Sequence, residues 1–243
     1  MERKAQSKKL DYKKEFPDLY LPGKKPMLIE VPKMTFVMVE GKGDPNTSAA
    51  YADALSLLYG LSFGIKMNLK FSKVPGDILE GMSVEKGSAV SEGNYVVPPL
   101  EGLWWTADAH TAFNGKNLVN KSELSWFSMI RQPDEVTEEL FTWAKEELGK
   151  KKPELDTSTA HLVRYEEGLC VQLLHVGPYD DEPASIEILE QFIGEQGLEE
   201  DFRMDEREVQ KGRYHHEIYL GDPRRTAPER LKTVIRHPVR KKG

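Results

Sequence analysis

Cysteine is nearly absent from this sequence, since Cys170 is the only one among 243 residues. A single thiol cannot form an internal disulfide, which is typical of proteins in a reducing compartment, so we expect a cytoplasmic protein. Long apolar runs are also missing. No stretch reaches the roughly 18 apolar residues of a membrane span, so we expect no contact with a membrane. The charged N-terminus lacks the apolar centre of a secretory signal peptide.

A large excess of charge of one sign is missing as well. The formal net charge is −6, from 34 Lys and Arg residues against 40 Asp and Glu residues. This balance gives no electrostatic reason to bind a phosphate backbone, so we expect no direct contact with nucleic acid. With 39% hydrophobic and 30% charged residues, the chain can bury a sizeable core. The composition therefore predicts a folded globular protein.

The common phosphate, hydrolase and metal motifs are absent too. Gly41-Lys42-Gly43 has no third glycine at the spacing of a dinucleotide fingerprint, and neither a phosphate loop nor a Gly-x-Ser-x-Gly elbow occurs. The run His215-His216-Glu217 contains residue types that bind zinc, but neighbouring residues of a strand point to opposite faces. We therefore expect no metal and no cofactor. Cys170 lies inside an apolar run and is interpreted as an inert core thiol.

Residues 1–30 differ from the rest of the chain. They mix charged side chains with Tyr12, Phe16 and Tyr20, which is typical of an arm that lies on the surface of a domain by its aromatic residues. The basic side chains leave open a contact of this arm with an acidic partner or with nucleic acid, but their excess is small, and we expect a solvated surface arm. The segment has too few apolar positions to build a helix-turn-helix, so we do not expect a transcription factor.

Strand and helix patterns alternate through the remaining residues. β-rich runs between turn residues predict strands, and apolar residues at helical spacing predict helices. We predict strands at 34–41, 103–106, 124–131, 168–176, 213–220 and 231–239, and helices at about 47–60, 134–149 and 183–194. The segment 72–94 shows neither period and predicts a long loop, which either covers one mouth of a binding site or is an insertion without a role.

The two halves of the chain repeat the same order of elements. Gly43, Ala50, Leu55 and Gly60 recur at the spacing of Gly177, Ala184, Leu189 and Gly194. These are residues that a strand-helix unit needs: a glycine after the strand, small and Leu residues that face the sheet, and a glycine that ends the helix. We therefore predict one α+β domain at 31–243, with two βαββ repeats at about 34–131 and 160–238 joined by the helix at 134–149.

One predicted strand carries an acid where a hydrocarbon is expected. Period-2 alternation in RYHHEIYL places His215, Glu217 and Tyr219 on one face, and Ile218 and Leu220 on the other. The two aliphatic residues suit the face that helices cover. Glu217 then lies on the opposite face, where it either lines a cavity or is a solvated residue paired with a nearby Arg or His.

Aromatic residues accompany this acid in the first half. Alternation in the first strand places Phe36, Met38 and Glu40 on one face. Trp104, Trp105 and Trp126 add large aromatic surface to later strands. A single Trp on a strand is usually a core residue, but several together with two Glu residues favour a pocket for a flat apolar or cationic ligand.

Several segments resemble one family. LHVGPYDDEP and HHEIYLGDPRRTAPERLKTVIRHPV are similar to the GyrI-like family, whose members share the ligand-binding domain of bacterial multidrug-response transcription activators. The similarity covers about residues 10–243 and includes DYKKEFPDLYLP, VEGKGDPN, PPLEGLWW and LSWFSMIRQPDEVTEELF, which look like the stand-alone subgroup. The resemblance implies two pseudo-symmetric βαββ modules of the SHS2 type, with antiparallel sheets, helices on one side and a ligand cleft between the modules.

The resemblance also implies a function. Members bind bulky, often aromatic drugs, and Glu217 matches a buried Glu that contacts cationic ligands in the drug-sensing activators. Some stand-alone members resemble hydrolases that open the cyclopropane ring of DNA-alkylating toxins, which implies a bacterial detoxification enzyme. The alternatives are a non-catalytic drug-binding or sensing protein and, by family analogy, a module that interacts with DNA gyrase.

Roles for single residues follow as a hypothesis. Opening a cyclopropane conjugated to a dienone requires a water nucleophile and stabilisation of the oxygen that becomes a phenolate. Glu217 would deprotonate the water, and the hydroxyl of Tyr219 or Tyr179 would donate to the oxygen. The expected ligand-binding set is Phe36, Met38, Glu40, Trp105, Trp126, Tyr179, Glu217 and Tyr219.

Overall fold

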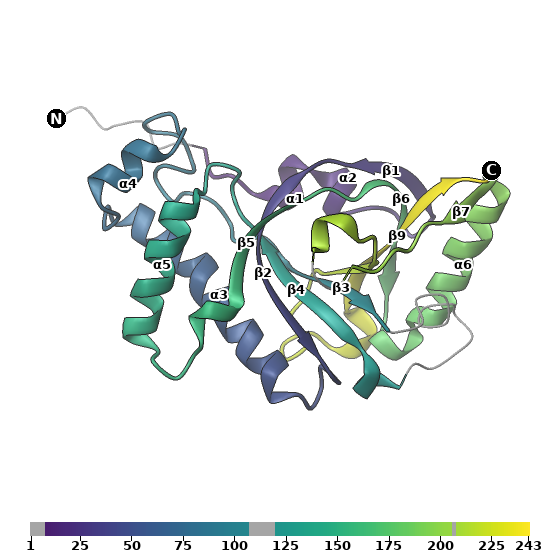
Figure 1. Cartoon of the computed structure of the whole chain (residues 1–243). Coiled ribbons are helices and arrows are strands. Elements are labelled where there is room, and N and C mark those ends of the chain that lie inside the picture. Colours follow the sequence, from purple (N-terminus) through teal and green to yellow (C-terminus); the bar gives the residue numbers. More distant parts are fainter. Residues whose placement is uncertain (1–7, 107–119, 206–207) are drawn as a thin grey trace.

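A large antiparallel sheet organises the computed structural model, which describes residues 8–106, 120–205 and 208–243. Its strands follow the order β1-β6-β9-β8-β3-β4-β2-β5, and β7 pairs with β9. Their bounds are β1 Met27–Val31, β2 Met34–Lys42, β3 Leu100–Trp105, β4 Ser125–Arg131, β5 Ala160–Tyr165, β6 Gly168–Val176, β7 Leu198–Glu200, β8 His215–Tyr219 and β9 Lys232–Lys241. The α+β class predicted from the sequence is confirmed (Figure 1).

The strand order reflects the internal repeat. β2, β3 and β4 correspond to β6, β8 and β9, and the two halves meet where β3 pairs with β8. The outer strands are exchanged between the halves: β1 precedes β2 in the chain but pairs with β6, and β5 precedes β6 but pairs with β2. Part of the segment predicted as an arm is therefore a strand of the sheet. Its pairing is with residues far along the chain, which a local pattern does not reveal.

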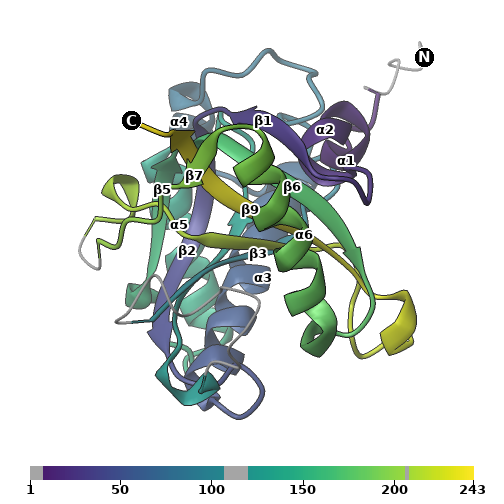
Figure 2. The same ribbon diagram turned by 90° about the vertical axis from the view of Figure 1, so that its right-hand side faces the viewer.

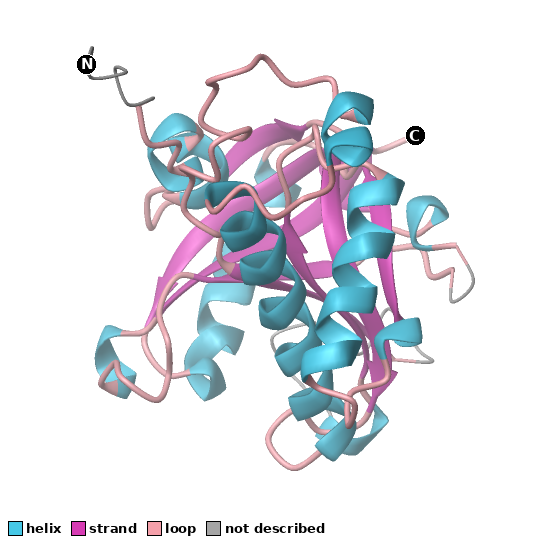
Figure 3. Cartoon of the chain, turned by 90° about the vertical axis from the view of Figure 1, so that its left-hand side faces the viewer, coloured by secondary structure: helices cyan, strands magenta, loops and turns pink. Residues whose placement is uncertain are grey.

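The long helices cover one face of the sheet. α3 (Ala49–Lys70) and α5 (Glu138–Lys151) pack on the first half, and α6 (Glu182–Glu195) packs on the second half (Figure 2, Figure 3). Alternate apolar residues of the strands face them, such as Val37 and Val39 in β2 and Val171 and Leu173 in β6. Among the described residues, no helix has the length and apolar character that crossing a bilayer requires.

The other face of the sheet is buried as well. Two short helices near the N-terminus, α1 (Tyr12–Glu15) and α2 (Pro17–Tyr20), lie against it. Tyr12 and Tyr20 are 5% and 1% exposed and pack with sheet residues such as Phe36 and Ile218. The aromatic residues thus hold this segment on the sheet, although Phe16 is exposed.

Gly60, which the sequence assigns to a helix end, lies inside a helix. α3 begins after Ser48, whose hydroxyl accepts from the Tyr51 N–H at 3.3 Å, and continues through Gly60 to Lys70. A Cβ at Gly60 would lie 3.1 Å from the methyls of Leu148, so this glycine lets α5 approach α3.

The ends of α5 are shifted in the same way. The helix begins at Glu138 with Thr137 as its cap, four residues beyond the expected start at Asp134, and it passes through Gly149 to Lys151. Asp134 instead accepts a hydrogen bond from the backbone N–H of Thr35 at 3.3 Å, which ties the connection to β2.

The segment 72–94 is not a featureless loop. It contains α4 (Gly76–Gly81) and buries Val74, Met82 and Val90 in the core formed with α3 and α5. Spacing alone did not show this, because the buried residues are far apart in the sequence. The segment is thus part of the first half's core.

A network of buried charges lies in the face that α1 and α2 cover. Glu167 accepts from Arg236 Nη1 at 2.7 Å and is 2.9 Å from Nδ1 of His216. The other ring nitrogen of His216 is 3.1 Å from Glu101. Burial would raise the pKa of Glu167, but the charges of His216 and Arg236 outweigh burial and hold it at about 2. The network is balanced because each buried charge has a partner of opposite sign.

We expect Glu167→Gln to lower the free energy of unfolding at pH 7 by about 3–5 kcal/mol, because Arg236 stays buried without its carboxylate. The folded pKa of Glu167 is depressed, so its stabilisation is present above the unfolded pKa of about 4.3 and is lost as pH falls towards 2. The difference between wild type and variant should therefore shrink over that range. Urea unfolding at several pH values measures both effects.

The matched control is Glu166→Gln. Glu166 is the preceding residue, but its side chain is 56% exposed and lies 3.7 Å from Lys33. A surface pair of this kind contributes little, so the change should stay within about 0.5 kcal/mol. Equal losses in the two variants would contradict the importance of the buried network.

Candidate functional site

Glu217 lies at the centre of the sheet, on a strand that joins the two halves. It is opposite Gly102 of β3 and opposite Ile235 of β9. Paired residues of antiparallel strands share a face, and Ile235 packs against α6, so Glu217 points to the helix-covered face. The assignment of Ile218 to that face is wrong, because Ile218 is buried in the core on the other side.

A glycine opposite Glu217 makes room for an indole. A Cβ at Gly102 would lie 2.5 Å from Nε1 of Trp104, so a side chain there would displace the ring. From this position the Trp104 N–H donates to the Tyr219 hydroxyl at 3.0 Å. That hydroxyl donates in turn to Oε2 of Glu217 at 2.6 Å. The indole therefore orients the phenol that holds the carboxylate.

The Glu217 carboxylate is enclosed and ionised. Its side chain is 12% exposed, and Oε1 lies 2.9 Å from Nε2 of His215. Burial by itself would raise the pKa of Glu217. The hydrogen bonds from His215 and Tyr219 outweigh burial, so this pKa lies below its ordinary value. At neutral pH the group is a carboxylate that can accept a proton.

A second carboxyl, which the sequence analysis did not identify, lies beside the first. Glu182 opens α6 and is 6% exposed. Burial, followed by the negative charge of Glu217, raises the pKa of Glu182 well above its ordinary value. Two adjacent carboxyls of this kind divide the roles, so Glu217 carries the charge and Glu182 carries a proton.

The sequence contained only a weak signal for Glu182. It ends the acidic run Asp180-Asp181-Glu182 before Pro183, and acidic residues at a helix start are expected from the helix dipole alone. Asp180 and Asp181 are indeed exposed. The packing of α6 against the second half of the sheet turns Glu182 inward, next to Thr233 of β9.

Aromatic rings from both halves surround the two carboxyls. The Tyr51 ring of α3 lies 6.0 Å from Trp104 and meets Trp126 edge-on at 5.0 Å. Tyr179, in the turn before α6, meets Tyr219 edge-on at 5.7 Å. Burial, followed by the charge of Glu182, raises the pKa of Tyr179 to about 12, so its hydroxyl stays protonated. The rings thus form an apolar environment in which tyrosine hydroxyls lie close to Glu182 and Glu217.

The structure brings together only part of the predicted ligand-binding set. Tyr179, Glu217 and Tyr219 are neighbours, and Trp126 joins them through Tyr51. The remaining members, Phe36, Met38, Trp105 and Glu40, are elsewhere. The first three belong to the core on the opposite face, and Glu40 is exposed near the end of β2.

The structure therefore does not place these four residues beside Glu217, contrary to what the predicted ligand-binding set implies. The ladder from β2 through β4 and β3 to β8 aligns Val39 with Ser128, Ser128 with Gly102, and Gly102 with Glu217. Val39 and its alternation partners thus lie on the face of Glu217, while Phe36 and Met38 lie on the other.

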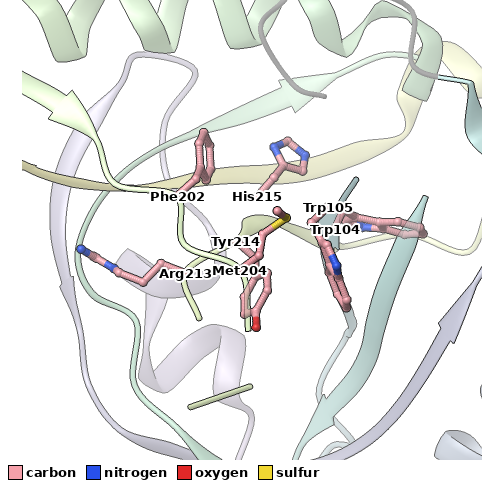
Figure 4. A pocket seen from close by; sticks show the side chains of 7 residues that line it. All are labelled: Trp104, Trp105, Phe202, Met204, Arg213, Tyr214 and His215. Atoms are coloured by element: carbon pink, nitrogen blue, oxygen red, sulfur yellow. The ribbon is translucent and has the colours of Figure 1, made fainter. Parts of the chain in front are cut away.

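Two hollows lie near the predicted ligand-binding residues, but Glu217 lines neither of them. A small one of about 10 Å³ lies beside His215 and has room for about one water molecule. Figure 4 shows its lining: Trp104, Trp105, Phe202, Met204, Arg213, Tyr214 and His215. A wider one of about 530 Å³ is lined by Glu40, Gly41, Lys42, Trp105, Ser125, Thr159 and His161. A ligand cleft above Glu217 remains a prediction.

The site is suited to proton transfer. It combines an ionised carboxylate, a protonated carboxyl, phenol hydroxyls and closely packed aromatic rings. Within the residues that the structure describes, no group of three or more His, Cys, Asp or Glu side chains is arranged to hold a metal ion.

Several solved structures are similar to this chain. The chain is similar to an uncharacterized conserved protein from Listeria innocua, with 42% identity and a TM-score of 0.79, and to a hydrolase from the same organism, with 40% identity and a TM-score of 0.76. A hydrolase encoded by lin2189 of Listeria innocua is 42% identical, also with a TM-score of 0.76. Each of these comparisons covers 96% of this chain and 100% of the other. No curated protein matches the chain.

A family model describes nearly the whole length. The model of the GyrI-like small molecule binding domain matches residues 24–240, which include β1 through most of β9 and all of the residues around Glu217. The chain therefore belongs to the GyrI-like small-molecule-binding domain family.

Proposed function

We propose that this protein binds bulky aromatic or amphipathic compounds between α3 and α6 and hydrolyses reactive toxins of the cyclopropanoid type there. The observation that carries the proposal is the enclosed Glu217 carboxylate, which lies beside the protonated Glu182 and among aromatic rings. Membership in a small-molecule-binding family and the two similar Listeria innocua hydrolases support it.

Glu217 is suited to activate water. A general base must be ionised at the working pH and must be held in a fixed orientation. Hydrogen bonds from His215 and Tyr219 provide both conditions, one at each carboxylate oxygen. Because Tyr219 already donates to Glu217, we assign it the role of orienting the base.

The reaction balances with the groups at the site. A water oxygen forms a bond to a cyclopropane carbon, Glu217 takes the proton, and the strained carbon–carbon bond breaks. The electron pair of that bond moves through the dienone to its oxygen, which becomes a phenolate. Tyr179, whose hydroxyl stays protonated, donates a hydrogen bond to this oxygen, and Glu182 supplies the proton that converts the phenolate into a phenol.

A non-catalytic drug-binding or sensing protein is the second candidate. The same enclosed carboxylate and rings would attract a flat cation without any reaction. Formation of a water-added product, detected by mass spectrometry, separates the two functions. The interaction with DNA gyrase stays a prediction from family analogy.

Glu217→Gln should keep ligand binding and lose turnover. The amide has the size of the carboxylate but cannot accept the proton from water, so we expect turnover to fall by about 10²–10⁴-fold while the ligand Kd changes little. Product formation and binding are measured on the same preparation. Glu187→Gln, which neutralises an exposed acid on α6, is the control and should turn over like wild type. Turnover by the Glu217 variant at the wild-type rate would refute the role of this residue.

Binding itself can be followed by tryptophan fluorescence. A planar apolar compound bound beside Tyr219 should quench the emission of Trp104, because this indole hydrogen-bonds to the Tyr219 hydroxyl. We expect Trp104→Phe to remove most of the quenching. Trp143→Phe, on α5 and partly exposed, should preserve it. Quenching that survives in the Trp104 variant and disappears in the Trp143 variant would place the ligand elsewhere.

A further inference from the structure

Glu217 is the inner end of a chain of buried hydrogen bonds. Nε2 of His215 lies 2.9 Å from Glu217, and Nδ1 of His215 lies 2.7 Å from Nε2 of His237. Nδ1 of His237 lies 2.6 Å from Oε1 of Glu200. The two His side chains are 1% and 0% exposed, whereas that of Glu200 is 29% exposed. The chain thus connects the central carboxylate with a carboxylate near the surface.

The strands place these residues with little freedom. His237 lies on β9, and the three residues of β7 pair with the end of β9 so that Glu200 is opposite Val239, two residues from His237. The ring of Phe202 covers His237 at 5.0 Å between centroids. The side chain of Phe202 also lines the small hollow beside His215, which Figure 4 shows. Phe202 therefore lies beside both members of the His pair.

Counting protons gives the charge of this pair. A carboxylate only accepts hydrogen bonds, so Nε2 of His215 and Nδ1 of His237 must each carry a hydrogen. The contact of 2.7 Å between the inner nitrogens needs one further hydrogen, because two lone pairs repel each other at that distance. With both carboxylates ionised, this geometry has places for hydrogens on three of the four ring nitrogens, which gives the pair one positive charge, although burial by itself lowers the pKa of His215.

The other charged groups near the pair leave this count unchanged. His216 points to the opposite face, where Glu101 and Glu167 are its partners. Arg213 lines the hollow beside His215, but it is paired with Asp201 at 2.6 Å. At the inner end, Glu182 and Tyr219 adjoin Glu217.

We propose that Glu200 and His237 are positioning residues that fix His215 as an N–H donor to Glu217 and keep one positive charge beside that carboxylate. This inference rests on the proposed function for its catalytic meaning, since it explains how the base stays ionised next to a protonated carboxyl. The positive charge favours ionisation of Glu217 over that of Glu182, so the division of roles between the two acids depends on Glu200, a residue that does not touch the site.

The test is Glu200→Gln in the full chain. The amide replaces the carboxylate of Glu200, which stabilises the positive charge of the His215–His237 pair. The pair should then lose its third hydrogen, and Glu217 loses the positive charge beside it. Carboxyl ¹³C NMR of glutamate-labelled protein, with the Glu217 signal identified by its loss in E217Q, should show a titration midpoint higher by about one pH unit. Ring ¹⁵N NMR should show three protonated nitrogens in the pair of the wild type and two in the variant.

Glu199→Gln is the matched control. It removes the same charge from the preceding position of β7, where Glu199 pairs with Arg240 on an exposed surface. The Glu217 midpoint should stay at its wild-type value. Glu200→Asp retains the negative charge and should bring the Glu217 titration midpoint at least part of the way back to its wild-type value. This result would separate loss of the hydrogen-bond chain from general damage to the fold. An unchanged midpoint in Glu200→Gln, or equal shifts in the two Gln variants, would overturn the proposal.

Turnover provides a separate readout. In Glu200→Gln, the acidic limb of the kcat/KM profile should move to higher pH by the same amount as the NMR midpoint, with the plateau at higher pH retained. If wild type forms no water-added product while the NMR midpoint still moves in Glu200→Gln, the hydrolytic function fails and the positioning role stands. If wild type turns over and neither readout moves, the positioning role fails alone.

Discussion

The pairing of β3 with β8 is the constraint on which both the fold and the site depend. Each half of the sheet alone would end in a strand with unpaired backbone groups, and this ladder joins the two edges. Its register places Gly102 opposite Glu217 and Trp104 opposite His215. A slip by one residue would turn Glu217 into the opposite core and His216 towards the helices, so the register decides which acid the helices enclose.

Two adjacent histidines on β8 serve two charge networks on opposite faces. His215 contacts Glu217 and His237 under the helices, while His216 lies between Glu101 and Glu167 under the N-terminal segment. Strand alternation makes this separation automatic. The network of His216 is fully enclosed, and its groups hold one another in place. That of His215 ends at the partly exposed carboxylate of Glu200 on one side and at the aromatic rings around Glu217 on the other, where the proposed ligand would make contact.

The exchanged edge strands explain why local patterns predicted the centre of each half better than its borders. The strand and helix periods of β2, α3, β6 and α6 were visible because their partners lie nearby in the chain or in the same half. β1 and β5 are short, and each pairs with the first strand of the other half. Helix ends failed for a related reason: Gly60 resembles a terminator in sequence, but its role is the close approach of Leu148 from α5.

The sequence by itself determined the α+β class, the internal repeat, the family resemblance and the separation of Glu217 from Ile218. Only the tertiary structure decided which of these two faces the helices cover. The physical reason is that both faces of this sheet are buried, so Val37 and Val39 on one side and Phe36 and Met38 on the other look equally suited to a core. Period-2 alternation states which residues share a face, but it does not state what covers that face. The same limit concealed Glu182 and Glu200, whose roles come from elements that meet only in the folded chain.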